Sequence, residues 1–178
     1  TSDTVLLLAN GAANAAPADD DDYQGLRNAL QQVCEELATD IIRDAEGADH
    51  FITIDVEGFA TRAAAYKVAK EIAESALVKT AITGNDPNWG RITSAAGYAG
   101  IDFDTAHLSL VINNTAVFQN GVPANFDEAE LSADMKNNRD VYLTLRLHGG
   151  PASGNERVRF WTSDLTQEYV RLNSDYTT

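Results

Sequence analysis

Val-Lys-Thr-Ala-Ile-Thr-Gly-Asn-Asp-Pro-Asn-Trp-Gly-Arg-Ile, residues 78–92, is the most distinctive stretch of this chain. From Gly84 to Arg91 it combines two glycines, a proline, a tryptophan, two asparagines and two opposite charges, which regular elements seldom need. Gly84 is expected to take a positive φ angle, and Asn85-Asp86-Pro87 is typical of a turn, because proline disfavours a helical predecessor. Asn88 is expected to cap the helix that follows.

Trp89 and Arg91 allow two interpretations of this turn. In the simpler one, the tryptophan fills the core and the arginine pairs with one of many nearby acidic residues. In the other, the turn serves a functional site, because its composition is more specialised than a connection requires. Composition alone leaves both open.

Apolar patterning on either side of this stretch predicts further strands and helices. Alternating and β-branched residues indicate strands at about 5–9, 51–57, 107–112, 141–147 and 157–161, the first of them buried. Helical spacing of apolar residues indicates helices at about 23–44, 62–74, 127–136 and 164–176. Thr61 is expected to cap the second of these helices, and Ser163 or Asp164 the last.

The order of these elements predicts the fold class. Strands and helices are mixed without a sustained βαβ repeat, so we expect an α+β layered fold rather than a doubly wound one. The length of 178 residues suits one domain, 1–178. Near Ala99 the predicted elements change to short strands and turns, which marks 1–98 and 99–178 as candidate subregions.

Composition excludes several classes of partner. A formal net charge of −14 argues against nucleic acid and anionic membranes, which need a positive face. No apolar run approaches the roughly 20 residues that span a bilayer. Cys34 is the only cysteine, which rules out an internal disulfide and favours a reducing, cytoplasmic location. It lies beside the apolar stripe of the first helix, so we expect a small buried side chain.

Metal and cofactor chemistry has little support in the sequence. His50, His107 and His148 are far apart, and the Cys and His clusters typical of zinc are missing, so no metal is expected. No glycine-rich loop has the lysine spacing of a nucleotide site, and no nucleophile elbow follows a strand. We therefore expect no cofactor.

Two residues remain as candidates for chemistry. Thr1 could use its own amine to activate its hydroxyl, although any chain must begin somewhere. Glu46 lies at the break between a long helix and a strand, where a carboxylate could donate a proton or hold a substrate ammonium. The alternative for Glu46 is a solvated loop carboxylate.

Several motifs, in order along the chain, resemble one known family. They are 78–91, Thr1-Ser2-Asp3-Thr4 with Ala9-Asn10-Gly11, Glu46-Gly47-Ala48, and Asp164-Leu165-Thr166 with Glu168-Tyr169-Val170-Arg171-Leu172-Asn173. Together they are similar to the bifunctional glutamate N-acetyltransferase / ornithine acetyltransferase family of arginine biosynthesis. The resemblance implies a layered α/β/β/α-type sandwich, the fold of self-cleaving, N-terminal-nucleophile-like ornithine acetyltransferases and aminopeptidases.

The resemblance also implies an activity and a partner. Family precursors cut themselves into an α and a β chain, which assemble as an α2β2 heterotetramer. The new N-terminal threonine of the β chain takes the acetyl group of N-acetylornithine and passes it to glutamate. A Thr-Gly pair of the α chain supplies the oxyanion hole. Whether acetyl-CoA is a further donor stays open.

The motifs carry the family's site residues onto particular positions. Glu46 matches the active-site glutamate, while Asn173 and Thr178 match the substrate-binding asparagine and threonine near the C-terminus. Thr1 does not match the nucleophile, which is expected a few dozen residues upstream of the Ser-Asp-Thr match. We therefore expect most of a β chain that lacks its leading segment, with the 84–91 turn shaping a wall near Glu46.

Two alternatives remain from other classes. The first is a related self-cleaving aminopeptidase or amidohydrolase, in which water replaces glutamate as the acceptor. The second is a catalytically silent fragment of a β chain, since the expected nucleophile is outside this sequence.

Overall fold

The structure is a computed structural model and describes residues 4–175, which form two compact units that divide between Ala38 and Thr39. In the first unit, the apolar run Val5 to Leu8 has no regular secondary structure, and its side chains are 72–87% exposed. The prediction of a buried strand here is wrong. A strand needs a neighbouring strand for its backbone hydrogen bonds, and the described residues offer this run none.

Helix α1 (Asp20–Arg43) confirms the long predicted helix and begins three residues earlier, at Asp20. Asp20, Asp21 and Asp22 occupy its first turn, where unpaired amides favour negative charge. Its apolar stripe is exposed, at 42–58% for Leu26, Leu30, Val33, Leu37 and Ile41. Cys34 is exposed as well, so its predicted burial is wrong, because no other described segment of the first unit covers this part of the helix.

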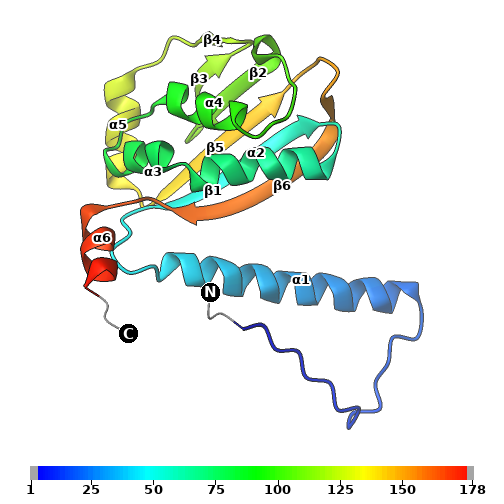
Figure 1. Cartoon of the computed structure of the whole chain (residues 1–178). Helices are drawn as coiled ribbons and strands as arrows, with labels where there is room; N and C mark the ends of the chain where they lie inside the picture. Colours follow the sequence, from blue (N-terminus) through cyan, green and yellow to red (C-terminus); the bar gives the residue numbers. More distant parts are fainter. Residues whose placement is uncertain (1–3, 176–178) are drawn as a thin grey trace. The chain divides into compact units, whose positions relative to one another are not determined.

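The second unit is built on a six-stranded mixed sheet (Figure 1). Its strands are β1 (Phe51–Phe59), β2 (Leu108–Ile112), β3 (Thr115–Gln119), β4 (Val122–Pro123), β5 (Asp140–Leu147) and β6 (Ser153–Ser163). The spatial order is β4-β3-β2-β5-β1-β6, with β1 parallel to β5 and the other neighbours antiparallel. Strands from both sides of Ala99 share this sheet, so the sheet is not divided at the change of pattern near that residue.

Helices cover one face of the sheet and complete the unit. Figure 1 shows α2 (Arg62–Glu74), α3 (Ala76–Thr83) and α4 (Trp89–Gly97) on that face. The remaining helical elements are a short 3-10 turn, η1 (Thr105–His107), and the helices α5 (Glu128–Asn137) and α6 (Gln167–Ser174). Side chains such as Ile54, Ile72 and Leu143 are almost fully buried between the layers. The α+β class is confirmed, and this chain supplies one sheet and one helical layer of the sandwich.

The signature stretch forms two helices around a tight turn. Residues before the turn belong to α3, which the sequence analysis missed. Gly84 has φ −80° and Asn85 has φ 54°, so the left-handed position was predicted one residue too early. Asparagine tolerates this region because its short polar side chain bonds locally. Asn88 caps α4 as expected, accepting from Arg91 N at 3.1 Å.

Trp89 and Arg91 hold α4 in place. Trp89 stacks on Phe118 of β3 at 5.1 Å between ring centroids, so the simpler interpretation of the tryptophan is confirmed. Arg91 does not pair with an acid; its Nη1 donates to Leu77 O of α3 at 3.0 Å. These contacts are with β3 and α3, not with Glu46, so the expected wall beside Glu46 is not formed by them.

Thr61→Ala tests the predicted cap of α2. Thr61 Oγ1 accepts from Ala64 N at 3.1 Å, and this bond satisfies a first-turn amide. Its loss should lower the free energy of unfolding by about 1 kcal/mol, measured by urea titration of the complete protein. Thr61→Ser keeps the oxygen and should stay within a few tenths of the parent. Equal effects of both substitutions would show that the methyl group matters, not the cap.

Candidate functional site

The turn that carries Glu46 joins α1 to β1. Ala45 N donates to Ile42 O and Ala48 N donates to Ala45 O, both at 3.2 Å, so the chain reverses tightly around Glu46. Gly47 completes the turn with φ +75°, a conformation that side chains with a Cβ rarely adopt. Glu46 is exposed. Its carboxylate is therefore open to a small molecule.

Helix α6 rests directly on this turn. Thr166 caps the helix, accepting from Tyr169 N at 2.9 Å, and its hydroxyl donates to Gly47 O. A Cβ on Gly47 would lie 2.6 Å from Tyr169 N, closer than any real contact, so only glycine fits against the helix. The expected cap at Ser163 or Asp164 is wrong, since the chain stays extended until Thr166.

Asn173 lies one turn further along the same helix. Its Nδ2 donates to Tyr169 O at 2.8 Å, and the residue is exposed. Four residues of helix advance about 6 Å, so Asn173 follows the contact with Gly47 closely. The structure thus brings the turn of Glu46 against the helix that carries Asn173. Thr178 and Thr1 lie outside the described residues.

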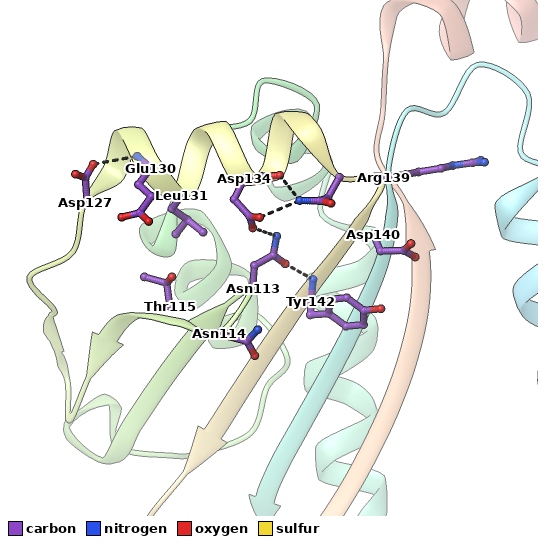
Figure 2. Close-up of a pocket in the computed structure, with 11 residues that line it drawn as sticks. Asn113, Asn114, Thr115, Asp127, Glu130, Leu131, Asp134, Arg139, Asp140 and Tyr142 are labelled. Carbon is purple, nitrogen blue, oxygen red and sulfur yellow. Dashed lines mark hydrogen bonds between the residues drawn. The ribbon is translucent and has the colours of Figure 1, made fainter.

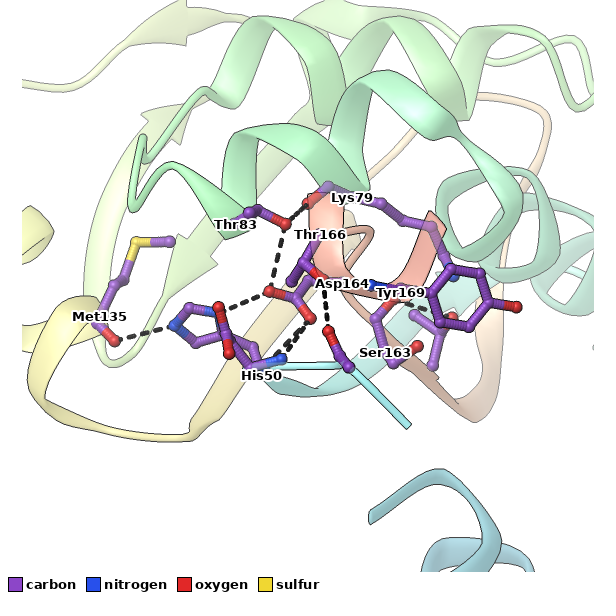
Figure 3. A network of polar contacts seen from close by, with 11 residues as sticks. His50, Lys79, Thr83, Met135, Ser163, Asp164, Thr166 and Tyr169 are labelled. Atoms are coloured by element: carbon purple, nitrogen blue, oxygen red, sulfur yellow. Dashed lines mark hydrogen bonds and ion pairs between the residues drawn. The ribbon is translucent and has the colours of Figure 1, made fainter. Parts of the chain in front are cut away.

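Beneath the turn lies a buried polar network that sequence reasoning missed (Figure 3). Its centre is Asp164, 1% exposed, whose Oδ2 lies 2.8 Å from Nδ1 of His50, 7% exposed. Thr83 Oγ1 donates to the same oxygen at 3.2 Å. Oδ1 accepts from the backbone N–H groups of Asp49 and His50 at 3.0 and 3.1 Å. A polar residue at each end of paired strands was the only sequence signal for this network.

The contact between His50 and Asp164 shifts the pKa of both residues. The hydrogen bond to Asp164 raises the pKa of His50 above its ordinary value of 6.5, although burial opposes this. Burial by itself would raise the pKa of Asp164, but hydrogen bonds and charge from His50 outweigh it and hold that pKa below 3.8. Near neutral pH the carboxylate is therefore ionised.

A cavity of about 480 Å³ lies beside α6. It is lined by Ala73, Glu74, Ala76, Lys79, Phe160, Thr162, Leu165 and Tyr169. Burial lowers the pKa of the Lys79 amine, while the nearby charge of Asp164 partly restores it. The cavity therefore presents one amine, from Lys79, and one carboxylate, from Glu74, among largely apolar side chains.

Another cavity, of about 500 Å³, lies elsewhere (Figure 2). It lies between α5 and the strands β2, β3 and β5, and none of the predicted site residues lines it. Asn113 spans its floor, donating to Asp134 Oδ2 and accepting from Tyr142 N, both at 2.8 Å. These polar groups satisfy one another, so the cavity shows a structural junction rather than a site awaiting a ligand.

Over residues 4–175 the structure gives no grouping of three or more His, Cys, Asp or Glu side chains that could hold a metal ion. Within the same range, none of the helices has the length and apolarity to cross a membrane.

Comparisons with known proteins agree with the motifs. The model of the ArgJ family matches residues 1–178. The arginine biosynthesis bifunctional protein ArgJ of Rhodopirellula baltica is 45% identical, covering 100% of this chain and 43% of that protein. The protein of the same name from Nitrobacter winogradskyi is 44% identical, covering 99% and 43%. The crystal structure of ArgJ from Bacillus halodurans superposes with a TM-score of 0.88 at 37% identity, covering 98% of this chain and 84% of that one.

These matches fix the lineage of the chain. The chain spans 43% of the length of the two curated relatives above. The similarity runs through every motif from the first residues to the C-terminal helix, and the fold agrees with a solved relative. On sequence and on fold alike, the chain belongs to the ArgJ family.

Proposed function

We propose that the protein to which this chain contributes moves the acetyl group of N-acetylornithine to glutamate. The observation that carries the proposal is the contact of the Glu46 turn with α6, in a chain that belongs to the ArgJ family. Relatives that match the whole chain are named arginine biosynthesis bifunctional proteins. This name and the resemblance of the motifs support the same reaction.

The proposed reaction has two halves. A threonine hydroxyl, from a segment upstream of this sequence, attacks the acetyl carbonyl of N-acetylornithine. The new C–O bond forms as the amide C–N bond breaks, and the hydroxyl proton passes to the leaving amine of ornithine. The amine of glutamate then attacks the acetyl-threonine ester: the new C–N bond forms as the ester C–O bond breaks, and a proton of the amine returns to the threonine oxygen. Donors of the α chain stabilise the oxyanion in both halves.

Within this chain, Glu46 and Asn173 are the proposed contacts to substrate. An exposed carboxylate can hold a substrate ammonium or exchange a proton with it, and an exposed amide can bond a carboxylate or carbonyl. Thr178 is proposed as a third contact on the strength of its motif. The tight packing between the Glu46 turn and α6 supports a shared role, because the two segments cannot move independently.

The α chain of the same precursor is the proposed partner. The resemblance of the motifs supports this, since precursors of the family are cut into an α and a β chain, and the chain belongs to the ArgJ family. An α2β2 assembly, acetyl-CoA as a further donor and a cytoplasmic location remain predictions. The assembly can be checked by light scattering of the purified, processed enzyme.

Glu46→Gln in the complete enzyme tests the proposed function. Acetyl transfer to glutamate should fall at least about 10²-fold, because a neutral amide neither holds an ammonium nor exchanges a proton. Glu71→Gln is the matched control, since Glu71 is an exposed glutamate on α2. Unchanged acetyl transfer by Glu46→Gln would show that Glu46 is not a contact to substrate.

The products identify the acceptor. Incubation of the complete parent enzyme with N-acetylornithine should give acetylglutamate only when glutamate is present. Steady release of acetate without glutamate would favour the related amidohydrolases. If neither acetylglutamate nor acetate is formed, the result would favour a catalytically silent chain.

A further inference from the structure

We propose that His50 and Asp164 form a positioning pair that holds the Glu46 turn and α6 together for acetyl transfer. This inference rests on the proposed function, because it assigns the pair to that same site. Neither residue is proposed to touch substrate. Their role is to fix the two segments that do.

Asp164 is the point where three parts of the second unit meet. Its two oxygens accept from the backbone and ring of His50 at the start of β1, and from Thr83 at the end of α3. Asp164 itself follows β6, the strand that pairs with β1. The pair therefore locks the beginning of β1, the end of β6 and α3 into one arrangement (Figure 3).

Only a few residues of chain separate the His50–Asp164 pair from the two segments of the site. Oδ1 of Asp164 also holds the backbone N–H of Asp49, three residues after Glu46. In the other direction, Thr166 begins the cap of α6 only two residues after Asp164. The hydroxyl of Thr166 then closes the loop by donating to Gly47 O. A displacement of the pair would move both substrate-contacting segments at once.

The hydrogen-bond partners of His50 define its charge. Nδ1 faces the carboxylate of Asp164, and Nε2 lies 3.2 Å from the backbone oxygen of Met135. Both partners accept, and only the imidazolium ion can donate from both nitrogens. A neutral ring would leave a lone pair facing the carbonyl. The geometry therefore favours the charged form of His50.

Other charges around the pair act in both directions. Asp49 favours the imidazolium, and Lys79 on α3 faces the carboxylate. Lys136 and Arg139 line a cavity together with His50 and carry the same sign of charge as the imidazolium. The direct bond to Asp164 is the largest influence, so the pKa of His50 is raised overall.

The shift gives the pair a defined pH range. A raised pKa means that the stabilisation by His50 is complete below about 6.5 and is lost as the pH rises through the folded-state pKa. The lowered pKa of Asp164 means that its stabilisation is lost only as the pH falls below about 3.8. We expect the pair to hold α6 below the folded-state pKa of His50 and to release it as the pH rises through that pKa.

The test compares histidine variants of the complete, self-processed enzyme. The quantity measured is kcat/KM for acetyl transfer as a function of pH. His50→Gln should lose about tenfold or more near neutral pH, because misplaced binding groups cost rate, and its alkaline decline should disappear. His50→Lys retains a cation without titrating near neutrality, so it should recover part of the activity and shift that decline upward. His148→Gln is the matched control, since His148 is exposed and, among the described residues, its ring bonds to Ser109 Oγ alone, at 2.9 Å.

Amide hydrogen exchange of residues 45–49 and of α6 gives a second measurement that needs no activity. Protection factors, which are exchange rates divided into the intrinsic rate at the same pH, should fall in His50→Gln, and in the parent only above the pKa of His50. Kinetics and exchange of His50→Gln that match the parent would overturn the inference. If His50→Gln fails to fold, the inference is tested by His50→Lys and by the pH dependence of exchange in the parent. If the parent enzyme itself shows no acetyl transfer, the proposed function is wrong. The exchange measurements would still test whether the His50–Asp164 pair holds the two segments.

Discussion

Gly47→Ala should lower acetyl transfer by the complete enzyme about 10²-fold or more. The added Cβ would lie 2.6 Å from Tyr169 N and 2.8 Å from its Cα, and both are backbone atoms that no rotamer change can move. The backbone at φ +75° is also strained for any residue with a Cβ. Both strains are relieved only if α6 moves off the turn. That movement separates Glu46 from Asn173, and separations of about 1 Å can cost 10²-fold in rate.

Gly97→Ala provides the control for this substitution. Gly97 ends α4, and a Cβ there would meet nothing within 4 Å. It should leave the rate unchanged and stabilise the protein by up to about 1 kcal/mol, because alanine restricts the unfolded chain. Measurable activity near the parent level in Gly47→Ala would show that α6 need not rest on the turn.

Asp164→Asn should lower the free energy of unfolding by about 3–5 kcal/mol at neutral pH. The substitution leaves the buried His50 without its counter-charge and places an amide where a carboxylate accepted several bonds. Removing one partner of a buried ion pair is costly because the other charge cannot return to water. Urea unfolding of the complete enzyme, followed by circular dichroism, measures the loss.

Asp140→Asn separates burial from ion pairing. Asp140 pairs with Arg43 at 2.6 Å, but both side chains are about 40% exposed. Its loss should cost less than about 1 kcal/mol, as for other surface pairs. The cost of Asp164→Asn should also shrink in acid, since the parent loses the same charge below the lowered pKa of Asp164. Equal costs for both substitutions at neutral pH would contradict the buried network.

Local patterns in the sequence predicted most elements of the second unit. Alternation located β1 and β5, and the caps Thr61 and Asn88 were identified because capping depends on a few adjacent residues. The buried strand at Val5 was wrong for a related reason. An apolar run shows that a segment can be covered, but not which partner covers it.

The site was predictable only in part. Motifs located Glu46 and Asn173, but the network beneath them joins residues that no local pattern connects. Asp164 has the properties of a helix cap in sequence, and its burial is decided by pairing of β6 with β1. The left-handed residue beside Gly84 was missed by one position, because asparagine and glycine both tolerate that conformation.

The bonds that join Asp164 to His50 span 114 residues of chain. Contacts between such distant segments form late, because the intervening loop must first lose its freedom. The turn of Glu46 can therefore reach its final form only after β6 and α6 have been synthesised and have docked. During translation the bonds of Asp164 with Asp49 and His50 therefore cannot form until the chain has been synthesised as far as residue 164.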